Sequence, residues 1–159
     1  ENCADMALDE GDIDESFIAE ARSVVATGTH LSNTKTEAAV LKALTLARKH
    51  GLQTALDIDY RPNLWGVAGH GEGESRFVES AAVTAKLQAT LHLFDLIVGT
   101  EEEFLIAGGV PGDLMACLRA VRAGRVAVLP RAHKLIPGPR QIEAVRAYAQ
   151  AIHPEVFDV

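Results

Sequence analysis

Short apolar runs alternate with amphipathic stretches along most of this chain. The apolar runs predict buried strands over residues 23–27, 54–58, 96–98 and 125–129. Apolar residues that recur every three or four positions predict helices over residues 13–20, 34–50, 77–91, 101–107, 113–121 and 142–152. Strands and helices that alternate in this way indicate an α/β fold, with a mostly parallel sheet and helices on its faces.

The helix over residues 34–50 has recognisable ends. Thr34 and Glu37 form the T-x-x-E pattern of a capping box, and Gly51 is a typical helix stop. The predicted apolar stripe of this helix is Ala38, Leu41, Leu44 and Ala47. Residues 61–75 are rich in glycine and lack periodicity, so they predict a loop. They do not end in the G-K-[ST] of a phosphate-binding P-loop.

Parallel α/β sheets bind ligands outside the carboxyl ends of their strands. In this chain that rule points to residues 28–30, 57–61 and 99–103. In the second of these segments, strand alternation predicts that Asp57 and Asp59 face the same side. Arg61 is placed to offset their repulsion, a role that sugar hydroxyls or a metal ion could also fill. A guanidinium also suits a sugar-acid carboxylate, because it can donate two parallel hydrogen bonds. The alternative is a strand end that carries solvated charges and one local ion pair.

The third segment has two interpretations as well. Thr100 and Glu103 form a second capping-box pair, and three consecutive glutamates suit the positive end of a helix dipole. The functional interpretation is that Glu103 contacts the water shell of a Mg²⁺ ion that carries nucleotide phosphates, since Mg²⁺ prefers a few carboxylates and retained waters.

Composition and charge narrow the classes of function. The chain has 159 residues, 48% of them hydrophobic and 23% charged, which is ordinary for a globular protein. A net charge of -7 argues against nucleic acid or an anionic membrane as the main partner. No signal sequence or membrane-spanning run is apparent, and the two cysteines form no metal-binding pattern, so we expect a cytoplasmic protein. The start at Glu1 suggests a fragment or a processed product.

Several motifs in order resemble those of one enzyme family. The run D-I-D-Y-R-P-N-L-W at residues 57–65 resembles the D-x-N-x-R-x-x-L-W segment of PfkB sugar kinases. The run D-L-I-V-G-T-E-E-E-F at residues 95–104 resembles the strand and N-x-x-E segment of the same family. The runs E-N-C-A-D-M-A-L, T-G-T-H-L-S and W-G-V-A-G-H-G-E-G-E, which begin at residues 1, 27 and 65, are similar to the bacterial 5-dehydro-2-deoxygluconokinase subgroup.

This resemblance covers roughly residues 1–121 and implies a ribokinase-like three-layer fold, present as a partial domain. It implies ATP-dependent phosphorylation of 5-dehydro-2-deoxy-D-gluconate at its 6-hydroxyl, in myo-inositol catabolism, with Mg²⁺. Arg61 would bind the substrate carboxylate or lie near the phosphates, together with Asp57 and Asp59 as substrate-binding residues. Glu103 and Thr100 would belong to the nucleotide side, with Glu103 near Mg²⁺.

The sequence departs from the family pattern at three places. Asp59 and Thr100 stand where many relatives have asparagine, and the G-A-G-D run that carries the catalytic base of the family is absent. No catalytic residue is therefore assigned. Residues 122–159 do not match the kinase pattern and are interpreted as a divergent tail, so we expect the isolated chain to be inactive or nearly so.

Three other interpretations remain. The chain could derive from a kinase of the 2-keto-3-deoxygluconate type, be a non-catalytic remnant, or be a fusion whose last forty residues belong to another activity. We expect a small sugar acid and ATP as partners, and core strands exposed in a fragment favour a homo-oligomer.

Overall fold

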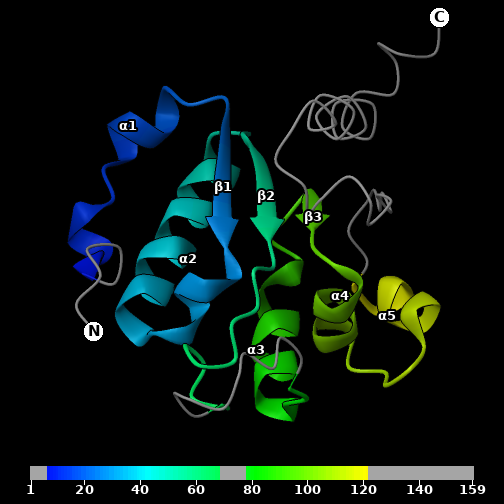
Figure 1. Cartoon of the computed structure of the whole chain (residues 1–159). Coiled ribbons are helices and arrows are strands. Elements are labelled where there is room, and N and C mark those ends of the chain that lie inside the picture. Colours follow the sequence, from blue (N-terminus) through cyan, green and yellow to red (C-terminus); the bar gives the residue numbers. More distant parts are fainter. Residues whose placement is uncertain (1–6, 69–77, 122–159) are drawn as a thin grey trace, which may run out of the picture. The chain divides into compact units, whose positions relative to one another are not determined.

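The computed structural model describes residues 7–68 and 78–121. Within them, three parallel strands form a sheet in the order β1-β2-β3 (Figure 1). Strand β1 spans Ser23–Thr27, β2 spans Gln53–Asp57 and β3 spans Leu96–Val98. The strand predicted at 125–129, the helix predicted at 142–152 and most of the glycine-rich loop lie outside the described residues, and the boundary proposed at residue 121 stays a prediction.

The helical elements lie before, between and after these strands, and from β1 onward they alternate with the strands as the apolar runs predict. Their bounds are η2 Glu10–Asp12, α1 Glu15–Ala19, η3 Gly28–Ser32, α2 Thr34–Lys49, α3 Ala81–Leu91, α4 Glu101–Gly108 and α5 Leu114–Val121. No helix formed by residues 7–68 or 78–121 has the length and apolar character needed to cross a membrane.

Helix α2 differs from its prediction at its start and on its buried face. The capping residue is Asn33, whose side chain accepts a hydrogen bond from the Lys35 amide, so the capping box predicted for Thr34 and Glu37 was wrong. Glu37 instead forms an ion pair with Lys86 of α3. The predicted stripe was only partly right. The buried residues of α2 are Thr36, Ala39, Val40, Ala43, Leu44 and Ala47.

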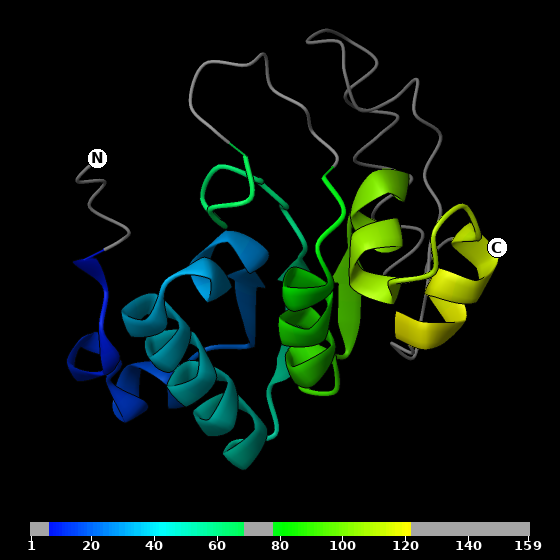
Figure 2. The ribbon, with the colours of Figure 1, turned by 90° about the horizontal axis from the view of Figure 1, so that it is seen from below.

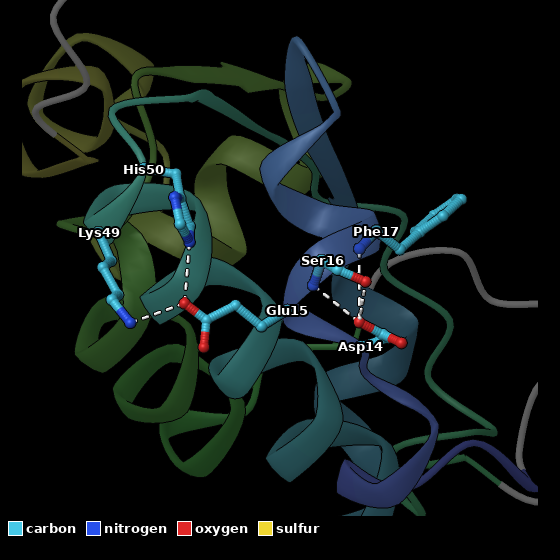
Figure 3. A network of polar contacts seen from close by, with 6 residues as sticks. All are labelled: Asp14, Glu15, Ser16, Phe17, Lys49 and His50. Carbon is cyan, nitrogen blue, oxygen red and sulfur yellow. Dashed lines mark hydrogen bonds and ion pairs between the residues drawn. The ribbon is translucent and has the colours of Figure 1, made fainter.

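Three other boundaries move by a few residues. Helix α1 starts at Glu15 rather than at residue 13, because the Asp14 carboxylate caps it by accepting hydrogen bonds from the amides of Ser16 and Phe17 (Figure 3). Helix α3 starts at Ala81 behind the cap Ser80, later than predicted, and β2 starts and ends one residue earlier. The two helices start where a capping side chain is present, and the shift of β2 is within the usual uncertainty of an element boundary.

One carboxylate joins α1 to the end of α2. Glu15 lies 2.6 Å from the Lys49 ammonium and 2.9 Å from Nε2 of His50 (Figure 3). All three side chains are partly exposed, so these contacts stabilise the chain modestly. They join the segment that precedes β1 to the end of α2.

The core of the described residues lies on one face of the sheet. Ala26, Leu56 and Ile97 are register partners across the three strands, and all three are buried. They belong to one apolar cluster with residues of α2 and α3, and α2 contacts both β1 and β2. On the opposite face, Val25 of β1 is 69% exposed. Burial of this face stabilises the sheet whose strand ends carry the candidate site.

Helices α4 and α5 pack closely together (Figures 1 and 2). Gly108, the last residue of α4, lies so near Cys117 of α5 that a Cβ atom at position 108 would overlap both the backbone and the side chain of Cys117. Cys117 is fully buried. A glycine is therefore required where these two helices meet.

Candidate functional site

The three strands end side by side at one edge of the sheet. Thr27, Asp57 and Val98 are register partners at the carboxyl ends of β1, β2 and β3. The segment after β1 turns directly against the segment after β2, because a Cβ atom at Gly28 would overlap the carbonyl oxygen of Ile58. This glycine allows η3 to approach the β2 exit closely. The side chains that follow the strands are thereby gathered at what we call the strand-end edge.

Asp59 is held in an unusual conformation at this edge. Its φ angle is 34°, in the left-handed region that non-glycine residues seldom adopt, although aspartate tolerates it better than most. One carboxylate oxygen accepts a hydrogen bond from Oγ1 of Thr29 at 2.9 Å, and the other accepts one from Nε of Arg61 at 3.0 Å. Such backbone conformations cost roughly 1–3 kcal/mol and persist where the surroundings hold them. The two contacts on the carboxylate supply that support.

Glu103 joins the β2 exit to the start of α4. Its Oε1 accepts a hydrogen bond from the Tyr60 amide at 3.0 Å, and its Oε2 accepts one from the Thr100 amide at 2.6 Å. The Glu103 amide in turn donates to Oγ1 of Thr100 at 3.3 Å, which completes the predicted capping box. A single carboxylate therefore caps α4 and fastens the loop that carries Asp59 and Arg61.

Negative charge converges on Asp57. Partial burial raises the pKa of the Asp57 carboxyl above its ordinary value of 3.8, and the charges of Glu103 and Asp59 raise this pKa further. A hydrogen bond from the Asp59 amide and the positive charge of Arg61 act in the opposite direction. The edge thus combines three carboxylates with one guanidinium. Carboxylates in this arrangement can accept hydrogen bonds from hydroxyls, and the guanidinium can bind an anionic group.

The structure brings the five predicted site residues to the same edge: Asp57, Asp59, Arg61, Thr100 and Glu103. Asp57 and Asp59 are close for a reason other than the predicted one, because β2 ends at Asp57 and the turn at Asp59 replaces strand alternation. Among residues 7–68 and 78–121, no group of three or more histidine, cysteine, aspartate or glutamate side chains is arranged to hold a metal ion directly.

Two hydroxyl residues of the edge were not singled out by sequence reasoning. Oγ1 of Thr27 lies 2.8 Å from Oγ1 of Thr29, and Thr29 bonds to Asp59. The rule on strand ends had pointed to residues 28–30, but it gave no reason to choose a hydroxyl. The available signal was the T-G-T run itself, in which both threonines flank the glycine that approaches Ile58.

A cavity of about 310 Å³ lies elsewhere, between α3 and α4, and shares no lining residue with the strand-end edge. Two of its polar lining residues already support the fold. Thr84 donates to the carbonyl of Ile106, and Gln88 donates to the carbonyls of Ala107 and Gly108. The strand-end edge is therefore the stronger candidate site, since its charged side chains come from segments that follow different strands and lie close together.

Comparison with curated proteins identifies similar sequences. Over 104 residues, 65% of its length, the chain is 38% identical to the 5-dehydro-2-deoxygluconokinase of Geobacillus kaustophilus (strain HTA426). It is 38% identical to the protein of that name from Listeria monocytogenes serotype 4b (strain CLIP80459), and 33% identical to the one from Bacillus licheniformis. The chain resembles a segment of the 5-dehydro-2-deoxygluconokinases. It spans 28% of the length of each of these three relatives, and no protein-family model matches it.

A solved structure supports the fold assignment. The crystal structure of a PfkB protein from Polaromonas sp. JS666 superimposes with a TM-score of 0.58, at 22% sequence identity, over 74% of this chain and 36% of that one. The chain therefore has a ribokinase-like α/β fold with a parallel sheet, as its sequence predicts.

Proposed function

We propose that this chain forms the sugar-acid side of the site of an ATP-dependent carbohydrate kinase. Its substrate would be 5-dehydro-2-deoxy-D-gluconate, phosphorylated at the 6-hydroxyl in myo-inositol catabolism. The observation that carries the proposal is the convergence of one guanidinium with three carboxylates at the strand-end edge. That edge lies where α/β sheets bind ligands, in a chain similar to proteins of that name.

Arg61 is the residue proposed to bind the carboxylate of the sugar acid. Its side chain is 64% exposed, and its Nε is oriented by Asp59. A planar guanidinium suits bidentate hydrogen bonding to a carboxylate, which a lysine in its place would not reproduce. Asp57 and Asp59 are proposed to face the sugar hydroxyls, and the raised pKa of Asp57 makes its carboxylate a stronger proton acceptor than that of an ordinary aspartate.

Glu103 and Thr100 are proposed to lie on the nucleotide side, with Mg²⁺ and ATP. Both carboxylate oxygens of Glu103 accept backbone N–H groups, so this residue fits a contact to the water shell of the ion better than direct ligation. Mg²⁺ supplies charge stabilisation to the phosphates when it is bound. The proposed role of Glu103 is then to hold the loop after β2 and the start of α4 in the arrangement that receives the phosphates.

Calorimetry with the purified chain tests the carboxylate role. We expect 5-dehydro-2-deoxygluconate to bind and 2-deoxyglucose, which has no carboxylate, to bind more weakly. Arg61→Gln should weaken sugar-acid binding about 10- to 100-fold, since a hydrogen bond to a charged group contributes roughly 1.5–3 kcal/mol. Arg22→Gln is the matched control, because Arg22 is exposed and precedes β1 at the other end of the strands. Equal effects of the two variants would contradict the assignment.

The same purified chain can distinguish the proposed function from two alternatives. Both sugar acids carry a carboxylate, so the Arg61 variant does not distinguish the two kinases. In a binding panel, a 2-keto-3-deoxygluconate-type kinase would bind 2-keto-3-deoxygluconate more tightly than 5-dehydro-2-deoxygluconate. Binding without turnover is the second candidate for these 159 residues, because they contain no G-A-G-D run. An ATP/ADP-coupled assay distinguishes that case from a kinase.

The buried thiol of Cys117 is free, which suits the reducing cytoplasm where we place this reaction.

A further inference from the structure

A short line of hydroxyl groups leads from β1 to Arg61. Oγ1 of Thr27 lies 2.8 Å from Oγ1 of Thr29, which lies 2.9 Å from Oδ2 of Asp59. Oδ1 of the same carboxylate lies 3.0 Å from Nε of Arg61. Thr29 is 9% exposed, while Arg61 is 64% exposed. The line therefore connects a buried hydroxyl of η3 to the exposed cation of the edge.

The two threonine hydroxyls donate their hydrogen bonds in the same direction, toward Asp59. A threonine hydroxyl has a single hydrogen, and that of Thr29 is donated to the carboxylate of Asp59. In the contact between the two threonines, Thr27 must then be the donor and Thr29 the acceptor. Both hydroxyl dipoles point toward Asp59, which strengthens the hydrogen bond from Thr29 to this carboxylate.

The carboxylate of Asp59 is fixed from two sides. Thr29 holds one oxygen and Arg61 holds the other, while the backbone of Asp59 stays in the left-handed region. Thr29 belongs to η3, whose start at Gly28 approaches the carbonyl of Ile58 too closely for any side chain at position 28. Thr29 thus links η3 to the turn at Asp59.

We propose that Thr29, supported by Thr27, is a positioning residue that orients Arg61 through Asp59. The link to sugar-acid recognition rests on the proposed function, whereas the orientation of Arg61 does not. An oriented guanidinium loses less side-chain freedom when it binds a carboxylate. Thr29→Val should weaken sugar-acid binding about 3- to 10-fold, the effect expected when one flexible side chain must be ordered on binding.

The decisive measurement is the NMR signal of the Arg61 Nε–Hε group in the full chain without ligand. Thr29→Val keeps the shape of the side chain and removes the hydroxyl. We expect it to shift this signal toward its position in Asp59→Asn and to speed its exchange with water. Thr29→Ser, which keeps the hydroxyl, should leave the signal near that of the original chain. Thr45→Val is the matched control, since Thr45 also donates to one acceptor, the carbonyl of Leu41, within α2.

The outcomes separate this proposal from the proposed function. An unchanged Arg61 signal in Thr29→Val, or equal changes in Thr29→Val and Thr29→Ser, would overturn the positioning role. A changed signal with no sugar-acid binding in any variant would support the positioning role and refute the proposed function. If Thr29→Val does not fold, Thr27→Val decides, because it should shift the Arg61 signal in the same direction by a smaller amount.

Discussion

Replacement of Glu103 by glutamine tests whether its carboxylate holds the loop after β2 against the start of α4, which we call its fastening role. The carboxylate accepts hydrogen bonds from the amides of Tyr60 and Thr100, at 3.0 and 2.6 Å. Glutamine has one side-chain oxygen, so one of these amides would face an NH₂ group instead of an acceptor. A hydrogen bond to a charged group contributes about 1.5–3 kcal/mol. Relief of the repulsion on Asp57 offsets part of this loss, because Glu103 raises the pKa of Asp57. We therefore expect Glu103→Gln to lower the free energy of unfolding by about 1–2 kcal/mol.

Urea denaturation followed by fluorescence measures this change directly. Trp65 is the only tryptophan of the chain, and it packs against the core just after the β2 exit. Glu101→Gln is the control, because Glu101 lies in the same first turn of α4, is exposed, and shares only the interaction with the helix dipole. Equal losses of stability in Glu101→Gln and Glu103→Gln would refute the fastening role. A changed dependence on urea concentration would indicate an altered unfolded state instead.

Three further predictions follow from other contacts. Asp57→Asn should be more stable than the original chain at pH 7. The pKa of Asp57 in the folded chain is raised above its ordinary value of 3.8, so ionisation of this carboxyl at neutral pH disfavours the folded state. This advantage should shrink as the pH falls toward 3.8, and an advantage that grows with acidity in urea denaturation would contradict the assignment. Gly108→Ala should lower the free energy of unfolding by about 1–3 kcal/mol through overlap with Cys117, and an unchanged melting temperature would refute that packing. Hydrogen bonds from Lys49 and His50 lower the pKa of Glu15 below 4.5, so the stability that Glu15 contributes is present above pH 4.5 and lost as the pH falls further. Glu15→Gln should therefore be less stable at neutral pH only, and an equal difference at acidic pH would contradict this.

Most of the fold could be predicted because its signals are local. Strands β1 and β3 and the capping box of α4 follow from runs of a few residues, and the structure has them where predicted. The start of α2 could not be chosen from the sequence, since Asn33 and Thr34 are both good caps. The hydroxyl of Thr36 donates to the carbonyls of His30 and Asn33, which favours the earlier cap. That contact depends on η3, which the periodicity did not indicate.

The site was predictable as a set of residues but not as a geometry. The rule on strand ends identified the segments of Asp57, Arg61 and Glu103, because the ends of parallel strands must meet. The turn at Asp59 was not predicted, since alternation had been extended past the last strand residue. The bond from Tyr60 to Glu103 spans 43 positions of sequence, and no local pattern encodes a contact over that distance.

Amide NMR during titration with a sugar acid tests most directly whether the strand ends form one binding site. The proposal predicts that 5-dehydro-2-deoxygluconate shifts the amides of Thr29, Asp59 and Thr100, which follow three different strands. The amides of Ser23 and Gln53, at the opposite ends of β1 and β2, should stay unchanged. Shifts confined to Ser23 and Gln53, or no shifts at saturating ligand, would contradict the assignment of this edge as a sugar-acid site.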